Sequence, residues 1–223
     1  MAPIIHTVNL RKVYAVGKER VVALNDVSIS IEKGEFCCIV GQSGSGKSTL
    51  LNQLAGLEKP TRGKVFIGSH EISAMTEDEL AKFRQAHLGF IFQSYNLLPT
   101  MTAAENVALP LMFKGISRSQ RLAMARALLH DTPIYLFDEA TSNVDAESEN
   151  DIMQAIHSLA GKKTIILISH RLANVVHSDC IYAMSNGRVI EQGTHAELLA
   201  KQGAYSRLYL AQRQLETLEE EDA

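Results

Sequence analysis

The chain has 223 residues, a formal net charge of −3 and a hydrophobic fraction of 46%, which suits one large domain with a buried core. Acidic and basic residues are intermixed, so the charge pattern gives no indication of a nucleic-acid-binding surface. The three cysteines form no CxxC or Cys/His metal spacing. We expect Cys37 and Cys38, which are adjacent in an apolar strand, to be buried reduced thiols of a cytosolic protein.

Membrane insertion is not expected from the sequence. No apolar run approaches the roughly 18 residues that a membrane-spanning helix needs. The N-terminus does not have the pattern of a signal peptide, and the acidic residues 216–222 are expected to be a solvated end. If the protein works at a membrane, we expect another chain to hold it there.

Strand and helix patterns alternate along the chain. Residues 4–31 contain three strand-like segments, at 4–8, 21–23 and 27–31. Further strands are predicted at 36–40, 64–67, 88–92, 134–137, 164–169, 180–184 and 188–192, and helices after residue 46, near 76–85 and at 147–159. This order predicts an α/β fold with a mostly parallel sheet flanked by helices.

A glycine-rich loop follows the strand 36–40 and opens a helix. Its residues are Gly41, Gln42, Ser43, Gly44, Ser45, Gly46, Lys47, Ser48 and Thr49. In this GxxxxGK[ST] pattern, backbone N–H groups and the positive end of the helix surround phosphate groups. Lys47 is expected to bind the β- and γ-phosphates and Ser48 to bind Mg²⁺. An ordinary glycine turn is the alternative, but the flanking strand and helix favour a nucleoside triphosphate site.

Two carboxylates stand at the end of the apolar strand 134–137. We expect Asp138 to hold Mg²⁺, directly or through water, and Glu139 to act as the base for the water that attacks the γ-phosphate. An apolar strand that ends in Asp-Glu is weak evidence by itself, because such strands often end in a solvated turn. The phosphate-binding loop upstream makes the catalytic interpretation strong.

Further candidates lie at other strand ends and before the loop. His170 follows the strand 164–169 and can orient Glu139, although a lone histidine is more often structural. Gln93 can contact Mg²⁺ or the attacking water, or it can simply cap a strand. Tyr14 can stack on a purine or pack at a sheet edge, and we also assign Val22 to the nucleotide site.

These motifs, in this order, resemble the nucleotide-binding domain of ATP-binding cassette (ABC) transporters over nearly the whole chain. By the resemblance, Tyr14 takes the A-loop position, residues 41–49 are Walker A, Gln93 is the Q-loop, residues 134–139 are Walker B, residues 142–145 are the D-loop and His170 is the switch histidine. The resemblance implies a P-loop NTPase fold with an antiparallel β subdomain and a helical subdomain. It also implies ATP and Mg²⁺ as ligands, with Glu139, His170 and Gln93 catalytic and Ser48, Gln93 and Asp138 at the metal.

The chain departs from this family at one place. The LSGGQ-type signature is missing, and residues 114–118 (Lys-Gly-Ile-Ser-Arg) stand before the helix that usually follows it. The interval between Gln93 and Asp138 leaves no room for a full helical subdomain. The N-terminal half resembles the ATPase subunits of macrolide and lipoprotein exporters, and the C-terminal half resembles ATPase domains fused to exporter membrane spans. We therefore interpret the chain as a mosaic without the signature.

The predicted organisation is a single domain over 1–223, with a shortened helical subdomain at about 94–130 and a C-terminal helix and acidic tail at about 204–223. The resemblance implies an ATPase subunit on the inner face of the cell membrane that pairs head to tail with a second ATP-binding domain and with transmembrane permease subunits. Two alternatives stay open at this point. One is a nucleotide-binding module with little hydrolysis, and the other is an ABC ATPase of ribosomes or DNA repair.

Overall fold

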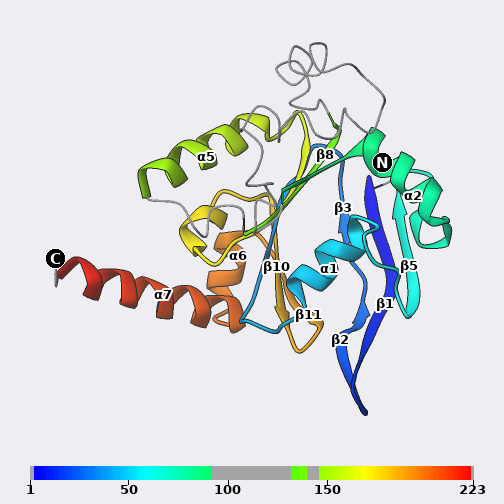
Figure 1. Cartoon of the computed structure of the whole chain (residues 1–223). Helices are drawn as coiled ribbons and strands as arrows, with labels where there is room; N and C mark the ends of the chain where they lie inside the picture. Colours follow the sequence, from blue (N-terminus) through cyan, green and yellow to red (C-terminus); the bar gives the residue numbers. More distant parts are fainter. Residues whose placement is uncertain (1–2, 92–131, 140–145, 222–223) are drawn as a thin grey trace, which may run out of the picture.

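The computed structural model describes residues 3–91, 132–139 and 146–221. Two β-sheets form its frame (Figure 1). The smaller sheet has five strands in the order β2-β1-β5-β6, with β3 also paired to β1. Its strands are β1 (Ile5–Val16), β2 (Glu19–Val27), β3 (Ser30–Ile31), β5 (Arg62–Ile67) and β6 (His70–Glu71), and all their pairings are antiparallel. The antiparallel β subdomain is present.

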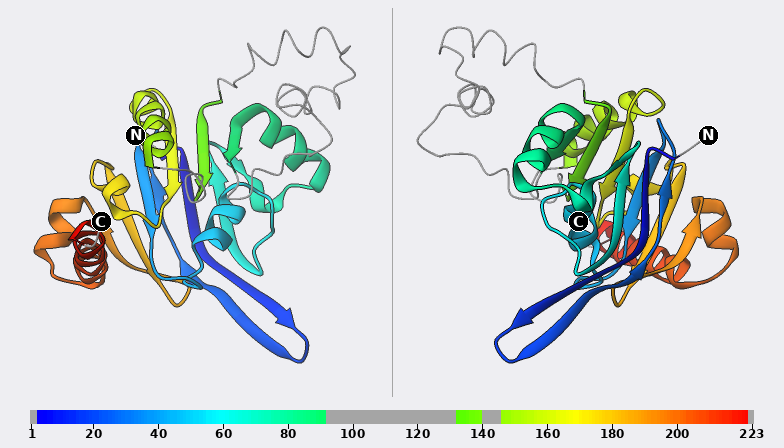
Figure 2. Two further views of the ribbon diagram at one scale, coloured as in Figure 1. Left: turned by 60° about the vertical axis from the view of Figure 1, so that its left-hand side comes forward. Right: turned by 90° about the vertical axis from the view of Figure 1, so that its right-hand side faces the viewer.

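Strands β1 and β2 form a long hairpin that projects from the body of the molecule (Figure 2). They are longer than the predicted segments 4–8 and 21–23, because pairing continues through polar residues up to Val16 opposite Glu19. Val16 near the tip is 61% exposed, so this end of the ribbon has no buried face. At this end, backbone hydrogen bonds hold the two strands together without a buried face. The sequence therefore shows no apolar alternation there from which the strands could be predicted.

The larger sheet has six strands in the order β11-β10-β4-β9-β8-β7. Its strands are β4 (Phe36–Val40), β7 (Leu88–Ile91), β8 (Ile134–Asp138), β9 (Thr164–Ile168), β10 (Cys180–Ser185) and β11 (Arg188–Gly193). The pairs from β10 to β7 are parallel, and β11 is antiparallel. Every residue of β4 and β9 is buried, as expected of central parallel strands. Cys37 and Cys38 are buried, unpaired thiols, as predicted.

Helices and the smaller sheet cover the two faces of the larger sheet (Figures 1 and 2). One apolar cluster joins α1 (Lys47–Leu54) and α2 (Glu77–His87) to both sheets. A second cluster joins the other face to α5 (Ala146–Leu159), α6 (His195–Ala200) and the first turn of α7 (Ala204–Glu221). Short 3-10 helices lie at η1 (Ile72–Ala74) and η2 (Leu172–Val175). The predicted α/β architecture is confirmed.

Several predictions fall outside the described residues. Gln93, the D-loop at 142–145, the segment 114–118 and the proposed shortened subdomain at about 94–130 all lie there. Among the helices that the structure describes, none is both long and apolar enough to cross a bilayer.

Candidate functional site

The predicted site residues meet where parallel strands of the larger sheet end. Strands β4, β8 and β9 are neighbours, and their carboxyl ends lead into Gly41, Glu139 and Ser169, respectively. A cavity of about 480 Å³ opens there. It is lined by Val21, Val22, Ala23, Ser43, Gly44, Gly46, Lys47, Ser48, Thr49, Glu139 and His170. Ligands of open α/β sheets bind at this kind of edge.

The loop between β4 and α1 is fixed by its neighbours. Gly46 has a φ of 100°, and a Cβ atom there would lie 2.5 Å from the carbonyl oxygen of Ala23. The N–H of Ser45 donates to the carbonyl of Gln42 at 3.2 Å, and the carbonyl of Ser45 accepts from Gly187 at 3.0 Å. Only glycine permits this close approach of the loop to β2. The loop therefore packs between the hairpins β1–β2 and β10–β11.

Lys47 lies at the inner side of this loop. Its side chain is buried, and Nζ donates to the carbonyls of Gly41 at 2.8 Å and Gln42 at 3.1 Å. Burial lowers the pKa of Lys47, and the nearby charges of Glu139 and Asp138 oppose that shift. A cation held in a partly desolvated loop has strong electrostatic attraction for phosphate.

Ser48 and Asp138 form the second pair of polar groups. The hydroxyl of Ser48 donates to Oδ1 of Asp138 at 3.1 Å, which joins α1 to the end of β8. Burial raises the pKa of Asp138, and the hydrogen bond from Ser48 opposes this shift. A hydroxyl and a carboxylate oxygen at this separation suit a hard cation such as Mg²⁺. These two predicted metal ligands are brought together, whereas Gln93 lies outside the described residues.

Glu139 and His170 form a direct contact across two strand ends. Oε1 of Glu139 is 2.5 Å from Nε2 of His170, and their side chains are 10% and 52% exposed. Glu139 has a φ of 48°, and its N–H donates to the carbonyl of Ile168 at 3.1 Å. A non-glycine residue in this left-handed region is uncommon and tends to occur at functional sites. The turn directs the carboxylate toward the histidine.

Val22, which we assign to the nucleotide site from the sequence, lines the cavity, and so do its neighbours Val21 and Ala23, which the sequence did not single out. Tyr14 is not among the lining residues. Its hydroxyl donates to Oε2 of Glu58 at 2.6 Å, and Nζ of Lys12 lies 5.1 Å from the centre of its ring. Burial, followed by the hydrogen bond with Glu58, raises the pKa of Tyr14. Its stacking role stays a prediction.

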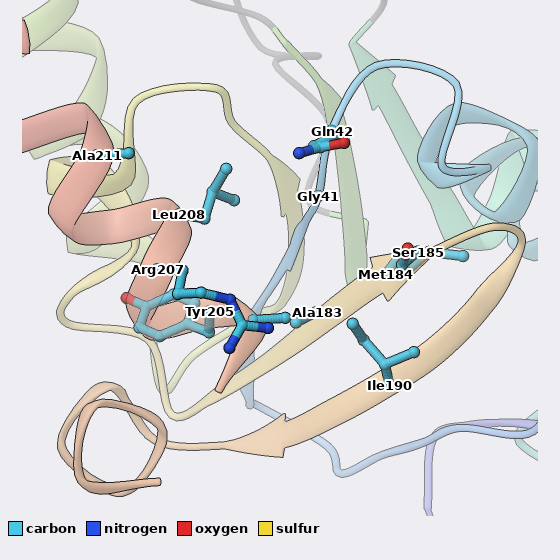
Figure 3. Close-up of a pocket in the computed structure, with 11 residues that line it drawn as sticks. Gly41, Gln42, Ala183, Met184, Ser185, Ile190, Tyr205, Arg207, Leu208 and Ala211 are labelled. Atoms are coloured by element: carbon cyan, nitrogen blue, oxygen red, sulfur yellow. The ribbon is translucent and has the colours of Figure 1, made fainter. Parts of the chain in front are cut away.

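A second cavity of about 480 Å³ lies beside the start of the same loop (Figure 3). It shares Gly41 and Gln42 with the loop and is otherwise bounded by β10, β11 and α7. Most of its lining side chains are apolar, and Arg207 is the charged residue among them. Its described lining residues include no carboxylate, histidine or thiol, unlike those of the cavity that contains Glu139 and His170.

Comparison with known sequences gives a consistent result. The family model described as "ABC transporter" matches residues 24–121. An uncharacterized ABC transporter ATP-binding protein of Thermotoga maritima is 36% identical, over 85% of this chain and 94% of the relative. The macrolide export ATP-binding/permease protein MacB of Hyphomonas neptunium is 35% identical, over 92% of this chain. The chain spans only 37% of that longer protein's length.

Solved structures agree with this. A dimeric structure of the ATP-binding cassette MJ0796, in a post-hydrolysis state bound to ADP and Pi, is similar with a TM-score of 0.77 and 33% identity. The match covers 85% of this chain and 98% of that chain. The P-loop NTPase fold is therefore confirmed. With the cavity, the Walker residues and the Thermotoga relative, this likeness shows that the chain is an ATP-binding domain of the ABC transporter family.

Proposed function

We propose that this domain binds Mg-ATP and hydrolyses it to ADP and phosphate, as the energy-coupling subunit of a membrane transporter. The observation that carries the proposal is the contact between Glu139 and His170 in the cavity that Lys47 and Ser48 also line. A carboxylate beside a phosphate-binding loop, oriented by a second residue, is the arrangement that water activation requires.

Each side chain has a separate task in this proposal. Lys47 binds the β- and γ-phosphates, and the loop amides and the start of α1 bind the remaining oxygens. Ser48 and Asp138 hold Mg²⁺, which supplies charge neutralisation for the phosphates when it is bound. Glu139 accepts the proton of the attacking water, and His170 fixes the direction of that carboxylate.

The proposed partners follow from the family. We expect a second ATP-binding domain in a head-to-tail dimer and separate permease subunits at the inner face of the cell membrane. The solved MJ0796 cassette is dimeric, and MacB is named as both ATP-binding and permease protein. We infer slow hydrolysis by this chain alone, because the sequence lacks the LSGGQ segment that would complete a partner's site. A binding module with little hydrolysis is the second candidate for the same reason.

The test is a comparison of the parent chain with Glu139→Gln. The amide keeps the shape of the carboxylate but accepts no proton, so ATP binding should persist while hydrolysis falls by about 10²-fold or more. Phosphate release under single-turnover conditions and titration with a fluorescent ATP analogue measure the two properties.

The outcomes separate the two candidates. Equal hydrolysis by the parent and Glu139→Gln would mean that Glu139 is not the base. Binding without hydrolysis above that of Glu139→Gln would leave the nucleotide-binding module as the function. His170→Ala should lower hydrolysis in the same direction as Glu139→Gln.

A further inference from the structure

A buried carboxylate lies behind the catalytic pair. Glu149 of α5 is an acidic residue that is only 3% exposed. It is not among the site residues predicted from the sequence. Its Oε2 forms an ion pair with Nη1 of Arg171, and its Oε1 accepts from Nδ2 of Asn174 at 2.9 Å. Both partners belong to the segment that follows β9, and Arg171 is the residue directly after His170.

Hydrogen bonds within the turn also hold the residues that follow His170. The N–H of Arg171 donates to Oγ of Ser169 at 3.1 Å, and the N–H of Asn174 donates to the carbonyl of Arg171 at 3.2 Å. Ser169 and Asn174 therefore fix the backbone of Arg171 from both sides. The side chains of Arg171 and Asn174 both bind Glu149, which attaches this turn to α5 and restrains the backbone that follows His170.

The attachment of this turn to Glu149 matters for His170 because the His170 side chain is itself half-exposed. The imidazole is 52% exposed, and it contacts Glu139, whose own backbone is in the left-handed region. The ring is therefore held by its contact with Glu139 and by the backbone from which it projects, so a shift of that backbone would move the ring relative to Glu139. A displacement of about 1 Å in a positioning group can lower a rate by roughly 10²-fold.

We propose that Glu149 is a positioning residue for hydrolysis, acting through Arg171 to hold His170 against Glu139. The proposal rests on the function proposed above. It adds that α5, the helix that carries Glu149, sets the geometry of the proposed catalytic pair.

A role in folding alone is the competing explanation, and the choice of variants addresses it. Glu149→Ala leaves Arg171 without its partner, but the Arg171 side chain is 54% exposed and its charge can turn to water. Glu149→Gln is milder, because its amide oxygen still accepts one hydrogen bond. Gln154→Ala, at an exposed position of the same helix, is the matched control.

The first readout separates rate from binding. Glu149→Ala should lower kcat by roughly 10- to 100-fold, with KM and the affinity for a fluorescent ATP analogue changed less than twofold. Glu149→Gln should fall between the parent and Glu149→Ala, and Gln154→Ala should match the parent. An equal loss of affinity and rate would overturn the proposal.

The second readout tests whether Glu149 acts through His170. If it does, Glu149→Ala added to His170→Ala should cause no further loss of kcat, whereas independent effects would multiply. A multiplicative loss would contradict a positioning role.

The third readout does not depend on hydrolysis, so it also applies if the parent chain proves inactive and the proposed function fails. The imidazole NMR signals of His170, assigned by their disappearance in His170→Ala, should shift or broaden in Glu149→Ala and stay unchanged in Gln154→Ala. The signals of His6 and His87, which belong to other elements, report on the fold. If these two signals also change in Glu149→Ala, the His170 signals of the milder variant Glu149→Gln are used for the comparison instead. Unchanged His170 signals in the Glu149 variants would overturn the proposal.

Discussion

At the scale of single residues, the site combines a contiguous loop with groups that the fold brings together from separate strands. Lys47 and Ser48 belong to one motif whose glycines, strand and helix are contiguous in the sequence. Glu139 and His170 are far apart in sequence, and their contact depends on β8 and β9 being neighbours. The role of Glu149 could not be predicted, because an Arg–Glu pair between α5 and a loop leaves no periodic pattern in the sequence.

The backbone conformation of Glu139 is strained, which its sequence position does not indicate. Its left-handed backbone, with a φ of 48°, costs of the order of 1–3 kcal/mol for a residue with a side chain. The hydrogen bond from its N–H to Ile168 offsets part of this cost, and the conformation places the carboxylate beside His170.

Tyr14 has two possible roles that a pair of variants can separate. If its ring stacks on the base of bound ATP, Tyr14→Phe should keep the affinity, and Tyr14→Ala should lose about 1–3 kcal/mol of binding energy, or roughly 5- to 150-fold. If its main role is the 2.6 Å bond to Glu58, the two variants should behave alike in ATP titrations and in thermal unfolding.

At the scale of elements, two predicted helices are observed close to their expected bounds. The acidic helix expected near 76–85 is α2, and Thr76 and Glu79 form a reciprocal capping box at its start. The expected helix 147–159 is observed as α5, from Ala146 to Leu159. The ends of β1 and β2 were predicted poorly, because a ribbon that projects from the body does not require apolar alternation.

The start of α7 depends on a contact with β11 that sequence patterns do not show. Both carboxylate oxygens of Glu191 accept from the first amides of the helix, from Ala204 at 2.7 Å and from Tyr205 at 2.9 Å. A Cβ atom at Gly203 would lie 1.7 Å from Oε1 of Glu191. The carboxylate therefore caps the helix only when residue 203 has no side chain.

Gly203→Ala should displace this cap and destabilise the first turn of α7 by about 1 kcal/mol. Glu191→Ala should have a similar effect, and the two changes together should not add, because each removes the same interaction. Hydrogen exchange of the α7 amides measures the effect. Full additivity would mean that Gly203 is needed for another reason.

At the scale of the whole molecule, the cavity of one chain is lined by the phosphate-binding loop and the proposed catalytic pair. By the family resemblance, the signature of a partner domain would complete such a site. We predict that Glu139→Gln, which should retain ATP, forms no stable ATP-dependent homodimer in size-exclusion chromatography. Insertion of a helical subdomain with an LSGGQ segment between Ile116 and Gln120 should restore dimerisation. In the parent background, the same insertion should raise turnover by roughly 10²-fold, on the scale of one lost oxyanion contact.

An ATP-dependent dimer of the chain without the insertion would contradict this prediction. It would indicate that residues of this chain other than an LSGGQ segment contact the partner's γ-phosphate. A grafted chain that dimerises without faster turnover would mean that the loss of rate has a different origin.

A direct titration tests whether one chain by itself binds Mg-ATP. The parent should bind a fluorescent ATP analogue saturably in the presence of Mg²⁺, and Lys47→Ala should weaken binding by an order of magnitude or more, because it removes the buried ammonium group that is proposed to bind the phosphates. Lys33→Ala, at an exposed position before β4, should bind like the parent. Equal binding by the parent and Lys47→Ala would contradict the account.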